Sequence, residues 1–172
     1  GAHVRGADGQ PLRMMTEREF RSQCLRCGEC VAACPTDVVK FGPLALGPDG
    51  VFTPVIEFEG GYCEPDCTIC GNVCPSGALR PFEESEKSSI RVGVAAIDRQ
   101  MCLSWGTDEA YVQCLQCFRV CPYDAIVAET VGGKVRSVVH PEECVGCGLC
   151  QIRCPVEPVS AIKVTSRNDS IE

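Results

Sequence analysis

The residues of this chain best suited to chemistry are its cysteines, which number 16 of 172. They fall without remainder into four blocks, each ending in Cys-Pro. The first and last blocks share the spacing C-x2-C-x2-C-x3-C; the second has one extra residue in its first gap, and the third has a long insert after its first cysteine. In block order the cysteines are Cys24, Cys27, Cys30 and Cys34; Cys63, Cys67, Cys70 and Cys74; Cys102, Cys114, Cys117 and Cys121; and Cys144, Cys147, Cys150 and Cys154.

This spacing is typical of ligands for a cubane [4Fe–4S] cluster, which takes one thiolate at each of its four iron corners. Three closely spaced cysteines reach three corners of one cube, and the fourth, before proline, ligates the other cluster in two-cluster ferredoxins. The proline suits the exit of the chain because it cannot continue the hydrogen bonding of a helix. We therefore predict four [4Fe–4S] clusters with all sixteen cysteines as iron ligands, and no catalytic residues.

Two other uses of cysteine, zinc binding and disulfide bonding, fit this spacing less well. Zinc would need separate C-x2-C pairs that close one tetrahedron, which leaves the regular fourth Cys-Pro unexplained. A disulfide scaffold would not repeat C-x2-C-x2-C so regularly, since neighbouring thiols in such a loop are poorly placed to bridge. Both readings are weaker than the cluster reading.

The two irregular blocks are where a three-iron cluster would arise if one thiolate were badly placed. Cys102 is the least secure ligand, because residues 103–113 must fold back to present it. The insert also holds the only tryptophan, Trp105, which would shield a cluster edge or fill a small core.

Glycines inside the blocks fit a cluster loop. Without a β-carbon they let the backbone approach the inorganic sulfurs and adopt conformations that other residues would strain. Backbone N–H groups aimed at the sulfurs then tune the reduction potential. These positions are Gly28, Gly71, Gly146 and Gly148.

Short helices and strands are expected to carry these loops, so the fold class is α+β. One short helix is predicted in each block, and a helix over residues 17–23, with the capping-box spacing Thr16-x-x-Glu19, is predicted to lead into Cys24. Each Cys-Pro is followed by a polar-then-apolar stretch that predicts a turn and strand. Further strands are predicted over residues 51–58, 90–97 and 134–139, with Gly132-Gly133 as a hairpin turn and residues 83–89 as a polar connector between strands.

The ends of the chain differ from the middle. Residues 1–15 are predicted to form an extended arm, residues 16–164 the four-cluster domain, and residues 165–172 a polar tail. The blocks can pair as a nest (first with fourth, second with third) or as neighbours (first with second, third with fourth). Both pairings give the same number of clusters, and the nest is our preferred one.

Charge and hydropathy exclude several classes. A formal charge of −7 argues against nucleic acid and suits a redox partner steered by complementary charge. No run is apolar and long enough to span a bilayer, so no transmembrane segment is expected in this chain. Scarce aromatic residues predict a small hydrophobic core, which needs bound metal to stabilise the fold.

The four blocks resemble the multi-cluster ferredoxins that shuttle electrons for molybdenum oxidoreductases, above all the ferredoxin-type accessory proteins of periplasmic nitrate reductase and methylamine-utilisation systems. The likeness spans roughly residues 17–164 and includes C-L-R-C-G-E-C-V-A-A-C-P and C-V-G-C-G-L-C. It implies two bacterial-ferredoxin-like lobes of short βαβ repeats, a linear chain of cubanes, and redox partners such as a quinol-linked membrane protein and a molybdenum oxidoreductase. It also implies export behind a twin-arginine signal, so a periplasmic location is expected, with the cytoplasm as the alternative.

The predicted function is therefore the relay of single electrons between redox partners, without substrate chemistry in this chain. No dinucleotide fingerprint or P-loop is present, and neither His3 nor His140 has a catalytic spacing. Two alternatives stay open: an enzyme in which one cluster has an open corner, and an assembly or structural protein whose clusters only hold the fold.

Overall fold

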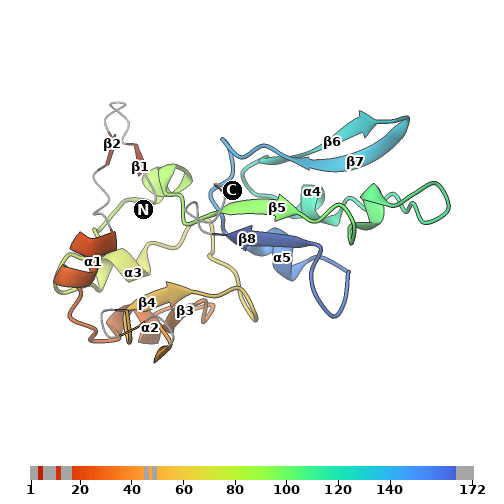
Figure 1. Ribbon diagram of the computed structural model, residues 1–172. Coiled ribbons are helices and arrows are strands. Elements are labelled where there is room, and N and C mark those ends of the chain that lie inside the picture. The colour runs from red at the N-terminus through yellow and green to blue at the C-terminus, as the bar shows by residue number, and fades with distance from the viewer. Residues whose placement is uncertain (1–3, 6–10, 13–16, 45–46, 48–49, 166–172) are drawn as a thin grey trace. The chain divides into compact units, whose positions relative to one another are not determined.

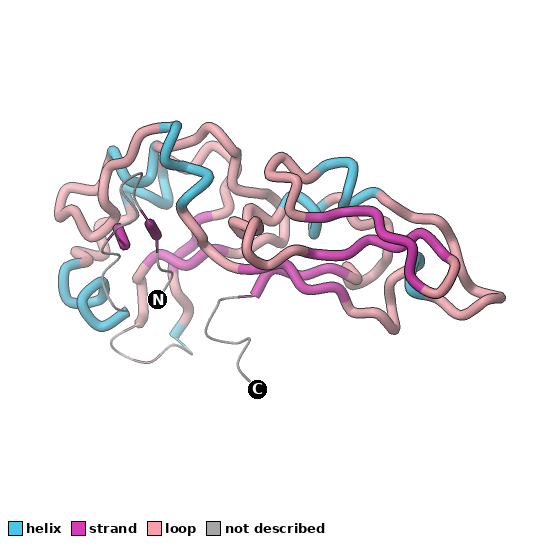
Figure 2. Tube along the Cα trace, turned by 90° about the horizontal axis from the view of Figure 1, so that it is seen from above, coloured by secondary structure: helices cyan, strands magenta, loops and turns pink. Residues whose placement is uncertain are grey.

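The computed structural model describes residues 4–5, 11–12, 17–44, 47 and 50–165 of the 172-residue chain. The chain divides into two compact units, residues 1–90 and 91–172. Unit 1 contains the first and second cysteine blocks, and unit 2 contains the third and fourth. In both units the helices and strands are short and are joined by long loops (Figures 1 and 2).

Unit 1 has two antiparallel strand pairs, β1 with β2 and β3 with β4. Its helices α2 and α3 each lie within a cysteine block and pack against each other. The elements are β1 (Val4–Arg5), β2 (Pro11–Leu12), α1 (Glu17–Gln23), α2 (Glu29–Ala32), β3 (Val39–Phe41), β4 (Pro54–Ile56), α3 (Ile69–Asn72) and the 3₁₀ helix η2 (Glu84–Ser89).

Unit 2 also has two antiparallel strand pairs. The hairpin β6–β7 turns at Gly132-Gly133, whose φ angles of 61° and 76° allow the tight two-residue turn. Strand β5 pairs with β8 from the other end of the unit, so that Ala95 lies opposite Val164 (Figure 1). The elements are β5 (Val94–Ile97), the 3₁₀ helix η3 (Leu103–Trp105), α4 (Gln116–Val120), β6 (Ile126–Val131), β7 (Lys134–Val139), α5 (Leu149–Ile152) and β8 (Ile162–Thr165).

Several sequence predictions are confirmed. The helix over residues 17–23 is present as α1, although Thr16 of its predicted cap lies outside the described residues. Each C-x2-C-x3-C-P stretch carries one short α-helix, and the Gly132-Gly133 hairpin forms as expected. The mixture of helices and strands is an α+β arrangement.

Two predictions about local structure are wrong. No strand follows the second block, where Pro81 has no backbone N–H to donate to a strand ladder and the N–H of Leu79 donates to Cys74 Sγ at 3.4 Å. Residues 83–89 are not a connector between strands: a capping box between Glu83 and Glu86 winds them into η2. Of the residues described in the predicted arm, β1 and β2 pair with each other, and Thr165 ends β8; the division into arm, four-cluster domain and tail stays a prediction.

The contacts inside the units favour the pairing of consecutive blocks over the nested pairing that we preferred. Helix α2 of the first block packs against α3 of the second within unit 1, and α4 of the third against α5 of the fourth within unit 2. Cysteine spacing does not distinguish the pairings, because every block offers one Cys-Pro thiol to any partner block.

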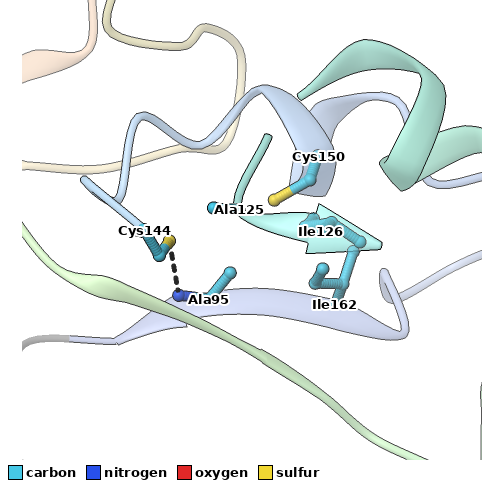
Figure 3. Close-up of a cluster of buried hydrophobic side chains, with 6 residues drawn as sticks. All are labelled: Ala95, Ala125, Ile126, Cys144, Cys150 and Ile162. Carbon is cyan, nitrogen blue, oxygen red and sulfur yellow. Dashed lines mark hydrogen bonds between the residues drawn. The ribbon is translucent and has the colours of Figure 1, made fainter. Parts of the chain in front are cut away.

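The hydrophobic core of unit 2 is small and includes two cysteines of the fourth block. Cys144 and Cys150 lie among Ala95, Ala125 and Ile126, and the N–H of Ala95 donates to Cys144 Sγ at 3.4 Å (Figure 3). Among the described residues of the chain, the largest fully buried apolar side chains are only isoleucine and valine. Cysteine sulfur therefore supplies a part of the interior that larger side chains fill in ordinary domains.

Candidate iron–sulfur centres

In unit 1, four thiols from two blocks line one cavity. Its walls include the first three cysteines of the first block and the last cysteine of the second; the four are Cys24, Cys27, Cys30 and Cys74. The cavity is partly open to solvent. Four thiols from two paired blocks around one hollow form the donor set that a cubane needs.

Unit 2 repeats this arrangement. One cavity is lined by the first three cysteines of the fourth block and the last cysteine of the third; the four are Cys144, Cys147, Cys150 and Cys121. In both units, the Cys-Pro cysteine of one block thus lines the same cavity as the first three cysteines of the other block.

Four of the eight remaining thiols affect the pKa of a thiol in their own block. The charges of Cys63 and Cys67 help to raise the pKa of Cys70, after burial, which is the largest cause. In the same way, burial and then the charge of Cys102 raise the pKa of Cys117, with Cys114 adding a smaller effect. Cys102 therefore lies near its block despite the long insert.

The insert of the third block is held against β7. Trp105 Nε1 donates to the carbonyl of Ser137 at 3.0 Å, and the hydroxyl of Tyr111 donates to the carbonyl of Val135 at 2.9 Å. The guanidinium groups of Arg99 and Arg136 lie 3.9 and 4.9 Å from the centre of the Trp105 ring. Trp105 thus anchors the segment that presents Cys102.

Two buried thiols, Cys30 and Cys150, are hard to ionise without a metal. Burial, followed by the charge of Cys24, raises the pKa of Cys30 to about 11. Burial also raises the pKa of Cys150, with Cys147 and Cys144 adding to the shift. A bound iron would supply the positive charge that holds such sulfurs as thiolates.

The last cysteine of each block in unit 1 is surrounded by hydrogen-bond donors. Burial alone would raise the pKa of Cys34, but bonds from the Val39 N–H and the Thr36 hydroxyl lower it. Cys74 follows the same pattern with the Leu79 N–H, and its pKa is also lowered. These donors stabilise a negatively charged sulfur, as a ligand thiolate requires.

Three of the four block glycines have a left-handed backbone. Gly28, Gly146 and Gly148 have φ angles of 80°, 75° and 84°, and Gly28 and Gly148 stand directly before α2 and α5. Gly71 lies inside α3, where a β-carbon would come within 2.5 Å of the Arg80 carbonyl oxygen. The glycines thus shape the ligand loops, as predicted from the sequence.

Gly146 gives the sharpest test of this requirement. A β-carbon there would lie 2.5 Å from the backbone nitrogen of Gly93, in addition to the strain of the positive φ. Gly146→Ala is expected to destabilise the cluster-loaded protein by about 2–4 kcal/mol. The control Gly133→Ala, with φ 76° and no atom within 4 Å, should cost only about 1 kcal/mol. Thermal unfolding followed by circular dichroism measures both; equal losses in Tm would contradict the close-approach argument.

Sequence reasoning missed Lys87, a buried lysine whose Nζ lies 3.1 Å from Cys63 Sγ. It stands in a polar, mostly acidic run, and nothing in that run distinguishes it from a solvated lysine. Only the folding of η2 toward the second block reveals it.

All sixteen cysteines lie among the described residues, and each is a free thiol. In the described part of the chain, no three His, Cys, Asp or Glu side chains are arranged to hold a single metal ion. Eight of the thiols instead line two cavities, four in each unit, and the chemistry of these donor sets fits [4Fe–4S] clusters.

Two Cys-rich blocks per unit, with the last cysteine of one block lining a cavity beside three cysteines of the other, resemble the bacterial type of two-cluster ferredoxin. Comparison with known proteins agrees, since residues 23–78 and 111–157 match the family described as the 4Fe-4S dicluster domain. The chain belongs to this family of ferredoxin-type proteins. It is an iron–sulfur electron-transfer protein.

Curated relatives match along most of the chain. It is 37% identical to the ferredoxin-type protein NapG of Escherichia coli K12, over 95% of this chain and 72% of that protein. It is 34% identical to NapG of Haemophilus influenzae, over 91% of this chain and 59% of the relative. The methylamine utilization ferredoxin-type protein MauM of Methylorubrum extorquens is 33% identical, over 92% and 72%. Of the helices described, none has the length and apolar character to cross a membrane.

Proposed function

We propose that the chain carries four [4Fe–4S] clusters, two in each unit, each held by three cysteines of one block and the Cys-Pro cysteine of its neighbour. The support is that each unit has one cavity lined by such a crossed set of four thiols. The same rule assigns the other eight ligands. In unit 1 these are Cys63, Cys67, Cys70 and Cys34; in unit 2 they are Cys102, Cys114, Cys117 and Cys154.

The four clusters form a relay for single electrons, and the chain performs no substrate chemistry of its own. A chemically inert [4Fe–4S] cluster has a thiolate on every iron, and the crossed sets supply four each. The alternative of an open cluster corner needs Cys102 to be absent from its cluster. Two observations speak against this alternative: the charge of Cys102 helps to raise the pKa of Cys117, and Trp105 ties the insert to β7.

The partners follow from the family. We propose a donor and an acceptor protein within a larger oxidoreductase system, such as a quinol-linked membrane protein and a molybdenum oxidoreductase, and no nucleic acid. We also propose a periplasmic location, which is based on the resemblance to periplasmic systems. The four-cluster region spans residues 16–164 as two ferredoxin-like lobes, with the boundary between them near residue 90.

Anaerobic iron and sulfide analysis tests the cluster number. The loaded protein is expected to contain about sixteen irons and sixteen sulfides per chain, and EPR of the reduced protein should show interacting paramagnetic clusters. About eight irons, or isolated signals without interaction, would overturn the four-cluster relay.

A further inference from the structure

Lys87 is buried in unit 1 and has no carboxylate partner among the described residues. Its side chain is 8% exposed, and its ammonium is absent from every ion pair within the described part of the chain. Its polar contacts are Cys63 Sγ at 3.1 Å and the Cys67 carbonyl oxygen at 2.7 Å, and its apolar contact is the Phe82 ring, 5.4 Å from Nζ to the ring centre. A buried ammonium without a counter-charge is costly, so a negative group must lie beside it.

The local structure holds this ammonium in place. Lys87 stands on η2, whose start is closed by the capping box of Glu83 and Glu86. Glu86 also pairs with Arg80 at 3.2 Å. Because the helix is tied at its first turn, the lysine projects to the same position beside the second block rather than sampling solvent.

The corresponding cluster of unit 2 has a different neighbour. There the first thiol of the third block, Cys102, faces the hydroxyl of Ser104 at 3.4 Å. Ser104 Oγ accepts from the N–H of Ser137 at 3.4 Å, which leaves its O–H free to donate to the sulfur. A neutral donor thus stands in unit 2 where a cation stands in unit 1.

We propose that Lys87 is a positioning residue that raises the reduction potential of the cluster held in part by Cys63. This inference rests on the proposed cluster assignment. Reduction adds one electron to the cluster and transfers no proton, so the cluster with its thiolates goes from a charge of −2 to −3. An ammonium hydrogen-bonded to one ligand sulfur stabilises the more negative state more strongly.

Charge removal gives the test. In Lys87→Met and Lys87→Gln, one midpoint potential of the loaded protein should fall while the others stay in place. The expected change is about 30- to 100-fold in the equilibrium constant for one-electron reduction, or about 90–120 mV at 59 mV per tenfold. Redox titration followed by EPR measures it.

Lys40→Met is the matched control, because it removes the same charge from unit 1 where the lysine pairs with Asp37 at the surface. It should change the same equilibrium constant by less than about twofold, since solvent screens an exposed charge. Fully loaded Lys87 variants with unshifted potentials would overturn the proposal. So would loss of the cluster from both variants, which would make Lys87 a residue for cluster retention. A low iron content in the unsubstituted protein would instead overturn the four-cluster assignment, and a shift in one potential would still show the effect of Lys87.

Discussion

Replacing Cys24 and Cys74 together by alanine is expected to remove one cluster, whereas replacing Cys63 and Cys74 together is expected to damage two. Crossed ligation assigns Cys24 and Cys74 to the same cube, because both line the same cavity of unit 1. The same proposal assigns Cys63 to the other cube of that unit. Mössbauer spectroscopy of ⁵⁷Fe-loaded protein counts intact four-iron and three-iron clusters separately, so it should find three intact [4Fe–4S] clusters in the first variant and two in the second.

The mirror variants control for a general loss of stability. Cys34 and Cys63 replaced together should again remove one cluster, and Cys24 and Cys34 replaced together should damage two. The opposite pattern, with Cys63 and Cys74 costing only one cluster, would mean that each block ligates its own cube. It would contradict the assignment while leaving the number of clusters intact.

The candidate ligands were predictable from sequence because most thiols of one cluster lie close together along the chain. Three thiols that must reach three corners of one cube have to lie within a short loop, and the C-x2-C spacing meets this requirement. The pairing of blocks was not predictable in this way. Cys34 and Cys74 occupy equivalent places before proline, and only the packing of α2 against α3 favours one partner block.

The local fold was predictable where backbone hydrogen bonds stay within a strand or helix. The β6–β7 hairpin follows from its two glycines, and α1 appears with the bounds expected. The strand predicted after the second block is absent, and this stretch runs into Pro81, which has no backbone N–H for a strand ladder. Lys87 was missed because its role depends on a contact with Cys63, 24 residues away.

Anaerobic removal of iron is expected to unfold the chain. The described core holds few large apolar side chains, and Cys30, Cys144 and Cys150 are themselves among its buried residues. Because metal binding free energy is also folding free energy, loss of the clusters should lower the free energy of unfolding by roughly 5–15 kcal/mol, to about zero. Circular dichroism and hydrogen exchange of the chelator-treated protein under reducing conditions measure this loss.

The loss should be uneven along the chain. The β6–β7 hairpin has six residue pairs in register, and Tyr111 and Trp105 hold the insert against it without cluster atoms, so its amides should exchange last. The ligand loops around Gly28 and Gly148 have no comparable backbone ladder and should exchange first. Reconstitution with ferrous iron and sulfide should restore the native exchange pattern. If the iron-free protein kept slow exchange at α2 and α5, apolar packing rather than the clusters would be stabilising the fold of each unit.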